Sequence, residues 1–475
     1  MTETLRTVIV YINYAILLYV FFLMSTYLLL SFLSFFGIKR YFRKTSYYDR
    51  RNIFSSLNHI PISVIVPAYN EQNGIVENVK SLLQLEYPEF QLVVVNDGSK
   101  DSTLEALLKN FNTRQISFKP WYNLKSEKIR AVYVSTDYPN LIVVDKENGG
   151  KADAINAGVN IAKHPLVTVI DADSILERDC LLKIVVPFLE DKNVVAVGGT
   201  IRIANGCEIE QGNIKSVGLP KSILAKFQVV EYIRAFIFGR TGFERINSLL
   251  IVSGAFSCFV KETVIDIGGF KTGSIGEDME IIVRMHKELR KKNPKMKITF
   301  VPDPVCWTEA PENFKILKSQ RTRWQKGTLE SILAHKELLF NPRYKLMGLI
   351  GFPYYFFIEM LGPLIEILGY VIFIISVLFG WVSYYFAIVF LCVAILYGII
   401  ISILSIILEE ISFTKYPKLR HLIEMLFLCV LENFGYRQLT TLWRFSAIIE
   451  YAFGKRKWEK MEKKGFQKVE EKNEN

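Results

Sequence analysis

A long apolar run near the N-terminus places the strongest constraint on how this 475-residue chain folds. Residues 8–36 (VIVYINYAILLYVFFLMSTYLLLSFLSFF) hold no charged side chain, and the run exceeds the ~20 apolar residues that a helix needs to cross a bilayer. The run is too long for the core of a signal peptide, and no small-residue cleavage site follows it. The basic stretch KRYFRK at 39–44 follows instead, and such stretches stay on the cytoplasmic side. We therefore predict a membrane anchor whose N-terminus lies outside the cell.

Two further apolar blocks occupy the C-terminal part of the chain, at residues 346–379 and 384–408. The first block holds Glu359 and Glu366 and is longer than one span needs, so part of it is expected in the membrane interface. Both acids could instead line one face of a path through the membrane, because acids in a span are costly and usually functional. The segment 421–435 is too short and too charged to span, and we expect it at the interface or packed against the other helices.

These blocks divide the chain into three parts and predict a multi-pass protein of the plasma membrane, with the lipid bilayer as a partner. The predicted parts are an N-terminal transmembrane anchor (1–48), a cytoplasmic domain (49–340), and C-terminal transmembrane and interfacial helices with a basic cytoplasmic tail (341–475). Much of the net charge of +11 lies in that tail, which suits an anionic inner leaflet. No basic helix or aromatic–basic repeat supports nucleic acid as a partner. The six cysteines are scattered without a CxxC pair, which favours reduced thiols over a metal cluster or a disulfide framework.

Between the apolar ends, short β-rich runs alternate with helical patterns. Between the first two runs, IVENVKSLLQL (75–85) places its apolar side chains at helical spacing. Strands that alternate with helices indicate a mostly parallel sheet with helices on both faces, which is the α/β class. The β-rich runs are ISVIVPA (62–68), QLVVVND (91–97), RAVYVS (130–135), LIVVD (141–145), LVTVIDAD (166–173) and VVAVGG (194–199).

The stretch VTVIDADS (167–174) carries two carboxylates, Asp171 and Asp173, at the end of a buried strand. Residues two apart in an extended chain point to the same side. Two negative charges at such a short distance repel each other unless a proton or a cation lies between them. In open α/β sheets, ligands bind outside the carboxyl ends of the strands. A hard cation such as Mg²⁺ or Mn²⁺ that joins these carboxylates to a diphosphate would resolve the repulsion.

Two other strand ends also carry polar residues. The first strand runs into PAYNE, with Ala68, Tyr69 and Glu71, and the second runs into NDGS, with Asp97. Asp97 alone is also explained as the cap of the helix expected at DSTLEALL. Three polar strand ends at one edge of a sheet are harder to explain by capping, and they favour a ligand site.

Lys151 in ENGGKADAIN is the basic group best placed to meet a phosphate. The stretch is no Walker loop, because position 145 is Asp and the full G-x-x-x-x-G-K-[ST] pattern is missing. The first strand is not followed by G-x-G-x-x-G, which argues against a dinucleotide-binding fold. A solvated lysine in a turn is the alternative reading of Lys151.

The stretch GED at 276–278 opens a helical pattern in which Asp278 and three apolar residues share one face. An acid at the start of a helix is stabilised by the helix dipole, and this is the structural explanation of Asp278. The functional explanation is a general base at the edge of a pocket. Both explanations stay open on the sequence.

The stretch QRTRW at 320–324 lies in a helical pattern that begins near Pro311. Gln320, Arg323 and Trp324 fall at i, i+3 and i+4, so they share one face. Trp stacks on sugar faces and Arg holds phosphate oxygens, so this face suits a sugar acceptor beside a diphosphate. A tryptophan on a helix is more often part of a core, which is the alternative.

Together these residues resemble the processive family 2 glycosyltransferases, the membrane synthases of cellulose, hyaluronan and poly-N-acetylglucosamine, over roughly residues 60–330. The resemblance is greatest to the bacterial poly-N-acetylglucosamine synthase-like branch, which GFERINSLLIVSGAF (242–256) and ENFGYRQ (432–438) also indicate. Gly276 stands where cellulose synthases carry Thr, which makes cellulose a less suitable product. The motifs that carry the resemblance are VPAYNE (66–71), VNDGS (95–99), NGGKADAIN (148–156), DAD (171–173), SGAF (253–256), GED (276–278) and QRTRW (320–324).

The resemblance implies an α/β GT-A fold and an inverting displacement that moves a sugar from a UDP-sugar, such as UDP-GlcNAc, to a growing glycan acceptor. It implies that Asp278 is the catalytic base and that Asp171 and Asp173 hold Mg²⁺ or Mn²⁺. The implied nucleotide-binding residues are Ala68, Tyr69, Glu71, Asp97, which would contact the uridine, and Lys151. The implied acceptor- and diphosphate-binding residues are Ser253, Gly254, Glu277, Gln320, Arg323 and Trp324.

We therefore expect a hexosyltransferase that elongates an exopolysaccharide on the cytoplasmic face, with export through its own helices and a small accessory membrane subunit as further expectations. The same chemistry fits transfer of one sugar to a lipid or another acceptor, although the Gln-x-x-Arg-Trp face argues against this. A sugar-nucleotide-binding subunit without turnover would have lost a carboxylate from the set, and none is missing. A phosphotransferase with Asp171 as its nucleophile lacks the other residues that such an enzyme needs.

Overall fold

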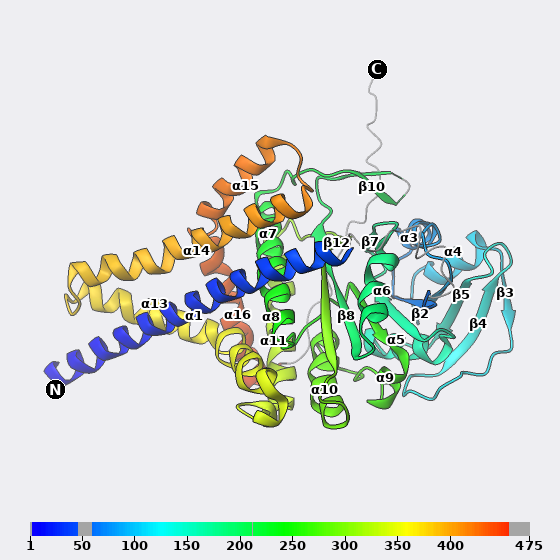
Figure 1. Cartoon of the computed structure of the whole chain (residues 1–475), viewed down its shortest axis with the longest axis horizontal. Coiled ribbons are helices and arrows are strands. Elements are labelled where there is room, and N and C mark those ends of the chain that lie inside the picture. The colour runs from blue at the N-terminus through cyan, green and yellow to red at the C-terminus, as the bar shows by residue number, and fades with distance from the viewer. Residues whose placement is uncertain (1, 46–58, 211, 456–475) are drawn as a thin grey trace, which may run out of the picture. The chain divides into compact units, whose positions relative to one another are not determined.

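The structure is a computed structural model that describes residues 2–45, 59–210 and 212–455 (Figure 1). The chain divides into two compact units, called here the sheet unit and the helical unit. The sheet unit consists of the described residues of Lys44–Gly218 and Val252–Ala310. The helical unit consists of the described residues of Met1–Arg43, Leu219–Ile251 and Pro311–Glu459. The three-part division expected from the sequence stays a prediction.

The described residues of the sheet unit form strands β1 (Ile62–Ala68), β2 (Phe90–Asp97), β3 (Thr113–Ile116), β4 (Ile129–Ser135), β5 (Leu141–Lys146), β6 (Leu166–Ile170), β7 (Ile175–Leu176), β8 (Val194–Ile203), β9 (Glu208–Glu210), β10 (Asn213–Ser216), β11 (Phe256–Val260) and β12 (Lys297–Thr308). Ten of them form one sheet in the order β3-β4-β5-β2-β1-β6-β11-β8-β12-β7, and β9 pairs with β10 separately. The neighbours β5, β2, β1 and β6 pair in parallel, as do β8 and β12. Antiparallel pairs lie on either side of the central four strands.

Helices cover the sheet, whose central strands are mostly apolar. In β1 the residues Ile62, Val64, Ile65 and Val66 are fully buried, which is the pattern of a parallel strand that is covered on both faces. The helices of the sheet unit are α3 (Ile75–Leu82), α4 (Thr103–Asn110), α5 (Lys151–Ile161), α6 (Cys180–Glu190), α9 (Lys261–Asp266) and α10 (Glu277–Lys292).

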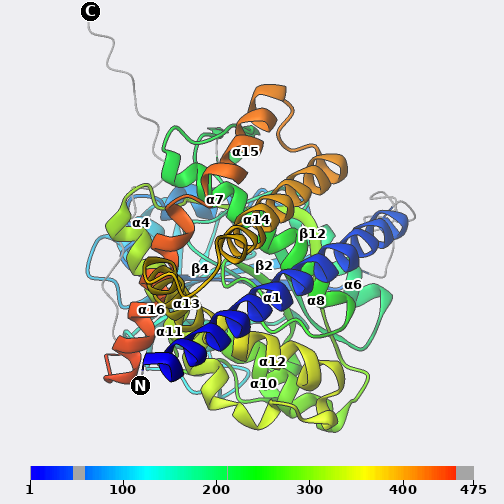
Figure 2. The same ribbon diagram turned by 90° about the vertical axis from the view of Figure 1, so that its left-hand side faces the viewer.

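The described part of the helical unit contains α1 (Thr2–Thr45), α7 (Ile223–Arg234), α8 (Thr241–Arg245), α11 (Phe314–Ala334), α12 (Phe352–Tyr354), α13 (Gly362–Leu378), α14 (Tyr384–Phe413), α15 (Leu419–Leu431) and α16 (Tyr436–Ala452). Short π-helical turns occupy Ala235–Arg240, Met347–Gly351 and Tyr355–Met360, and 3₁₀ turns occupy Lys336–Leu338 and Pro342–Tyr344. The long helices α1, α13 and α14 lie side by side (Figure 2). The amide of Asn13 donates to the Ser376 hydroxyl over 2.7 Å, and the rings of Phe373 and Phe390 stack 4.4 Å apart.

Two of these helices, Arg6–Arg43 and Tyr384–Phe413, are long and apolar enough to cross a membrane. The pair Met347–Met360 and Gly362–Leu378 is bent by 48° and would make a third crossing if it is one span. The sequence analysis expected three apolar spans in these regions. The segment 421–435 is covered mostly by α15, which pairs with α7 through Glu424 and Lys226. The predicted basic tail lies almost entirely outside the described residues, and the orientation in the membrane stays a prediction.

The predicted strands all match strands of the sheet, with one difference that matters for the site. The run 166–173 forms a shorter strand, because β6 ends at Ile170. The N–H of Ser174 then donates to the carbonyl of Asp171 over 3.1 Å and closes a turn. Asp171 and Asp173 therefore lie in a turn after the strand, so the argument that they share one side of an extended chain is wrong. The pairings of β11 with β6 and β8, and of β12 with β8, had no clear signal in the sequence, because these partners lie far apart along the chain.

Gly158 shows how closely α5 approaches the sheet. A Cβ at this position would lie 2.4 Å from Cγ2 of Ile65 in β1. We expect Gly158→Ala to lower the free energy of unfolding by about 1–3 kcal/mol, the usual cost of overpacking a core. Gly74→Ala is the control, because a Cβ there meets no atom within 4 Å, and it should change the free energy by less than about 0.5 kcal/mol. Urea unfolding of the purified protein measures both, and equal stability of the two variants would contradict the packing described.

Candidate active site

The polar strand ends meet at the carboxyl edge of the sheet. β1 pairs in parallel with β2 and with β6, and Ala68 at the end of β1 lies opposite Asn96 in β2. Asp97 is the last residue of β2, and Asp171 directly follows β6. Because parallel strands all end at the same edge, the three predicted polar ends lie along one side of the sheet unit.

Asp97 is buried and accepts four hydrogen bonds from one loop. Its Oδ1 accepts from Nζ of Lys146 at 2.6 Å and from the N–H of Gly149 at 3.0 Å. Its Oδ2 accepts from the side-chain amide of Asn148 at 3.0 Å and from the N–H of Gly150 at 2.8 Å. Helix α4 has Ser102 rather than Asp97 at its N-cap, so the capping explanation of Asp97 is wrong. The carboxylate holds the loop that leads into α5, and its four acceptor positions are filled from within the protein.

Lys146 is a buried cation that the sequence analysis missed. Its side chain is 0% exposed, and its Nζ lies 2.6 Å from Oδ1 of Asp97 and 2.6 Å from Oδ1 of Asp153. Asp153 in α5 also accepts from the N–H of Glu127 at 3.0 Å. A buried charge needs such partners, because burial without them costs several kcal/mol. The signal for Lys146 was a lysine at the end of the buried run LIVVDK, where a solvated lysine is not expected.

Lys151 lies among the acidic residues of the site. Its Nζ is 2.6 Å from Oδ1 of Asp171 and 3.0 Å from Oε1 of Glu277, and it donates to the carbonyl of Gly254 at 3.3 Å. Burial acts to lower the pKa of Lys151, but the charges of Asp171, Glu277 and Asp278 outweigh it and hold the pKa well above its usual value. The alternative of a solvated lysine in a turn is therefore wrong. Its ammonium joins α5, the end of β6 and the start of α10.

Asp278 faces the turn that precedes β11. Its Oδ2 accepts from the N–H of Gly254 at 3.2 Å, and its Oδ1 accepts from the N–H of Met279 at 2.9 Å. The second bond lies at the start of α10, so the helix-terminus explanation is part of the geometry too. Ser253 shapes the same turn, because its hydroxyl accepts from the N–H of Ala255 at 3.3 Å. The structure thus brings the predicted residues Lys151, Asp171, Gly254, Glu277 and Asp278 together in one cluster.

Asp171 and Asp173 could hold a divalent cation with help from a ligand. Both lie close to Cys306: burial raises the pKa of that thiol, and the charges of the two aspartates add to the rise. Among residues 2–45, 59–210 and 212–455, no group of three or more His, Cys, Asp or Glu side chains is arranged to hold a metal ion. Two carboxylates fit a hard cation that completes its coordination with phosphate and water, as Mg²⁺ commonly does.

The residues of PAYNE are held by the loop after β2. The N–H of Asn70 donates to the hydroxyl of Ser99 at 3.0 Å, and the N–H of Glu71 donates to the hydroxyl of Thr103 at 2.9 Å. Asn70 itself adopts a left-handed conformation with φ of 57°. Ala68 is buried, whereas Tyr69 and Glu71 are half-buried. The PAYNE stretch is therefore held by side-chain hydroxyls of the loop after β2 and of the first residue of α4.

The QRTRW residues belong to α11 of the helical unit. Gln320 is buried, Arg323 is half-buried and Trp324 is 42% exposed. The exposure of Trp324 argues against the alternative that it is a core residue. Arg321, which the sequence analysis did not select, is buried and places its Cζ 4.3 Å from the centre of the Trp324 ring.

The buried ion group of Lys146, Asp97 and Asp153 can be tested by its contribution to the free energy of unfolding. Lys146→Met keeps an unbranched side chain that is one atom shorter, and it leaves Asp97 and Asp153 without their cation. We expect a loss of about 3–5 kcal/mol in the free energy of unfolding, as for other broken buried ion pairs. Lys297→Met is the control: Lys297 pairs with Asp191 at 2.6 Å but is 49% exposed, so the loss should be about 0–1 kcal/mol. Chemical unfolding of both purified variants measures the difference, and similar losses would contradict the role given to Lys146.

Curated relatives of this chain are polysaccharide synthases. The chain is 29% identical over 297 residues to the poly-beta-1,6-N-acetyl-D-glucosamine synthase of Staphylococcus aureus (strain MSSA476), covering 60% of this chain and 61% of the relative. It is 30% identical over 275 residues to the synthase of the same name from Staphylococcus epidermidis, covering 57% of this chain and 55% of the relative. The match thus spans less than two thirds of the length of these relatives.

A similar fold occurs in a solved mannosyltransferase from Pyrobaculum calidifontis in complex with GDP-Man and Mn²⁺. The two structures share a TM-score of 0.52 with 18% sequence identity, over 90% of this chain and 99% of the other. At that identity the likeness shows the fold alone, and it confirms the expected α/β GT-A class.

Two family models match the sequence. The model for glycosyl transferase family 2 matches residues 63–246, which include the strand ends with Asp97, Lys151 and Asp171. The model for glycosyl transferase family group 2 matches residues 166–401, which include Asp278 and the QRTRW helix. Together the two matches run without a gap from the first strand of the sheet into α14, and the chain belongs to the family 2 glycosyltransferases.

Proposed function

We propose that this protein is an inverting hexosyltransferase that moves a sugar from a UDP-sugar onto the end of a growing exopolysaccharide. The observation that carries the proposal is the cluster of Lys151, Asp171, Glu277 and Asp278 at the carboxyl edge of the sheet, in a chain of this family. One cation among several carboxylates suits a reaction that must both accept a proton and neutralise a departing diphosphate. The named synthases support N-acetylglucosamine as the sugar.

Asp278 is the proposed general base. It takes the proton from an acceptor hydroxyl while the acceptor oxygen bonds to the anomeric carbon and the bond from that carbon to UDP breaks. Its Oδ2 is held by the N–H of Gly254, so the carboxylate is oriented before an acceptor binds. Fixed orientation of this kind lowers the entropic cost of reaching the transition state.

Lys151, Asp171 and Asp173 are the proposed diphosphate-binding groups. Asp171 and Asp173 would hold Mg²⁺ or Mn²⁺, which supplies positive charge where the UDP leaving group becomes more negative. Lys151 supplies a second positive charge beside Asp171. Glu277, the other carboxylate on Lys151, fixes the position of the ammonium.

The proposed nucleotide-binding residues are Ala68, Tyr69, Glu71 and Asp97. Asp97 accepts four internal hydrogen bonds, so a direct contact with the uridine would have to replace one of them. We assign Asp97 the task of holding the Gly149–Gly150 turn in front of α5. Through that turn it sets the position of Lys151, the first residue of the helix.

The remaining assignments follow the family. Ser253 and Gly254, with Gln320, Arg323 and Trp324 of α11, are the proposed acceptor- and diphosphate-binding residues. The apolar helices support a membrane location, with the reaction on the cytoplasmic side and a small accessory membrane subunit as a partner. Export of the glycan through the helices belongs to the same proposal.

Glu359 and Glu366 are the residues that support export. In the helical unit Arg444 donates to Oε2 of Glu359 over 3.1 Å, and Thr441 donates to Oε2 of Glu366 over 3.1 Å. Both donors belong to α16, so this helix places polar groups beside an apolar segment. Polar groups in such surroundings are costly and usually serve a function.

The proposal predicts a long product from one sugar. Membranes that contain this protein are given radiolabelled UDP-sugars with Mg²⁺ or Mn²⁺, and the labelled material is sized on a gel. We expect polymer from UDP-GlcNAc or a similar donor, loss of polymer with a chelator, and none from Asp173→Asn. A single sugar on lipid would contradict elongation but keep the site, and no transfer from any donor would contradict the whole proposal.

The role of Asp278 predicts a loss confined to catalysis. Asp278→Asn keeps the shape of the side chain but cannot accept the proton, so kcat should fall by about 10²–10⁴-fold. Affinity for UDP, measured by calorimetry, should stay within about twofold, because the uridine site lacks this residue. Asp266→Asn is the control, since Asp266 is exposed and lies at the end of α9. A normal kcat in Asp278→Asn would show that another group takes the proton.

A further inference from the structure

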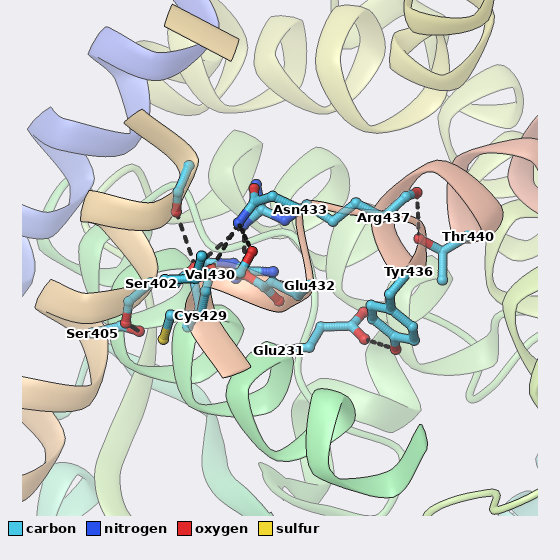
Figure 3. A network of polar contacts seen from close by, with 12 residues as sticks. Glu231, Ser402, Ser405, Cys429, Val430, Glu432, Asn433, Tyr436, Arg437 and Thr440 are labelled. Atoms are coloured by element: carbon cyan, nitrogen blue, oxygen red, sulfur yellow. Dashed lines mark hydrogen bonds and ion pairs between the residues drawn. The ribbon is translucent and has the colours of Figure 1, made fainter. Parts of the chain in front are cut away.

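The stretch ENFGYRQ (432–438) takes no part in the chemistry proposed above, although it is among the motifs that the sequence analysis selected. It links α15 to α16, and Tyr436 is the first residue of α16. Its side chains take part in a network of polar contacts inside the helical unit (Figure 3). The network reaches in two directions, towards α11 and towards α14.

The contacts towards α11 begin at Tyr436. Its hydroxyl donates to Oε2 of Glu231 in α7 over 2.8 Å. Its ring is 7% exposed, stacks on Phe227 with 4.9 Å between centroids, and packs with Leu224 and Leu317. Leu317 belongs to α11, so the ring of Tyr436 fixes the distance between α7, α11 and α16.

Glu231 connects Tyr436 with Arg321, because both donate to the same carboxylate oxygen. Nη2 of Arg321 donates to the same Oε2 of Glu231 over 2.8 Å. The side chain of Arg321 is only 3% exposed, and its Nε and Nη1 make no hydrogen bond within the described part of the chain. Glu231 therefore supplies the ion pair that a buried guanidinium requires.

Arg321 in turn sets the position of Trp324. The Cζ of its guanidinium lies 4.3 Å from the centre of the indole ring, the range in which a cation is attracted to an aromatic face. Trp324 remains 42% exposed, so its ring is held by Arg321 yet open to a ligand. A sugar-stacking ring must keep a fixed orientation, because a bound pyranose aligns with its face.

The contacts towards α14 anchor the other end of the stretch. Glu432 is fully buried and accepts from Nη1 of Arg234, from Nη2 of Arg437 at 2.9 Å and from the hydroxyl of Ser402 at 2.7 Å. Arg437 approaches α14 closely, because a Cβ on Gly398 would lie 2.6 Å from its Nη1. The stretch 432–438 is thus fixed to a long apolar helix by buried charge.

We propose that the stretch 432–438 orients the acceptor-binding ring of Trp324, with Tyr436 and Glu231 as positioning residues that act through Arg321. The inference rests on the proposed function, in which Trp324 stacks on the acceptor sugar. In this account the stretch ENFGYRQ, which is fixed to α14, influences the affinity for the acceptor. Neither residue touches the donor in this account, so donor affinity is independent of them.

Acceptor kinetics test this inference in the full chain. The probe is a short β-1,6-linked N-acetylglucosamine oligosaccharide added at varied concentration with saturating UDP-GlcNAc. Tyr436→Phe keeps the packed ring and removes only the hydroxyl, and Glu231→Gln removes the charge. Both should raise the acceptor KM, on the order of tenfold for the loss of a hydrogen bond to a charged group, while the donor KM stays within about twofold.

Glu450→Gln is the matched control. Glu450 pairs with Lys326 of the same helix α11 at 2.8 Å, and Lys326 is as buried as Arg321. This pair does not include the contact with Trp324, so the acceptor KM of Glu450→Gln should stay normal. A rise equal to that of Glu231→Gln would show a general effect on α11 and overturn the inference.

The variant Arg321→Lys tests whether Tyr436 and Glu231 act on Trp324 through Arg321. Lysine keeps the charge but lacks the planar group that stacks on the indole, so it should raise the acceptor KM by itself. Tyr436→Phe should then add less than about twofold, because both changes act on one contact. An independent effect of Tyr436→Phe in this background would overturn the role of Arg321 as the connecting residue.

Normal transfer with an unchanged acceptor KM in Tyr436→Phe and Glu231→Gln would overturn this inference alone. No transfer by the unaltered protein would overturn the proposed function as well.

Discussion

The buried ion group of Lys146, Asp97 and Asp153 is the constraint on which the site depends. A lysine with no exposed surface is tolerated only because both carboxylates lie 2.6 Å from its Nζ. Asp97 uses its other acceptor positions to fix the turn before α5, and Asp153 belongs to α5 itself. The end of β2, the end of β5 and the first turn of α5 are thereby held as one piece, which decides where Lys151 projects.

The ammonium of Lys151 offsets the repulsion between the carboxylates of the site. Asp171, Glu277 and Asp278 would repel each other at the edge of the sheet, and the ammonium of Lys151 lies among them. A metal-bound diphosphate would bring its own charges to this balance, with the cation on Asp171 and Asp173 and the phosphates beside Lys151. In the proposed function, a nucleotide with its metal ion would change the charge partners of these residues without leaving a carboxylate unopposed.

The sequence predicted the fold well where the signal is local. The apolar runs of β1, β2 and β5, the helix that holds QRTRW and the apolar helices were recognisable from periodicity and length alone. The antiparallel pairing of β11 between β6 and β8 was not, because it joins residues far apart along the chain. In the site, the structure places the predicted residues Lys151, Asp171, Glu277 and Asp278 close together, and their roles stay predictions. Lys146 was missed because the sequence does not show which carboxylates will lie beside it in the folded chain. Arg321 and Glu231 were missed for the same reason, since their pairing crosses from α11 to α7.

Binding of UDP to the purified protein tests the central claim most directly, because it depends on the cluster at the sheet edge and needs no acceptor. Calorimetry is done with Mn²⁺, with Mg²⁺ and with a chelator, on the unaltered protein and on Asp173→Asn. The account predicts that UDP binds with a divalent cation, that affinity falls at least about tenfold with the chelator, and that Asp173→Asn loses the effect of the cation. Equal affinity with and without the cation in both proteins would contradict the assignment of Asp171 and Asp173 to a metal-bound diphosphate.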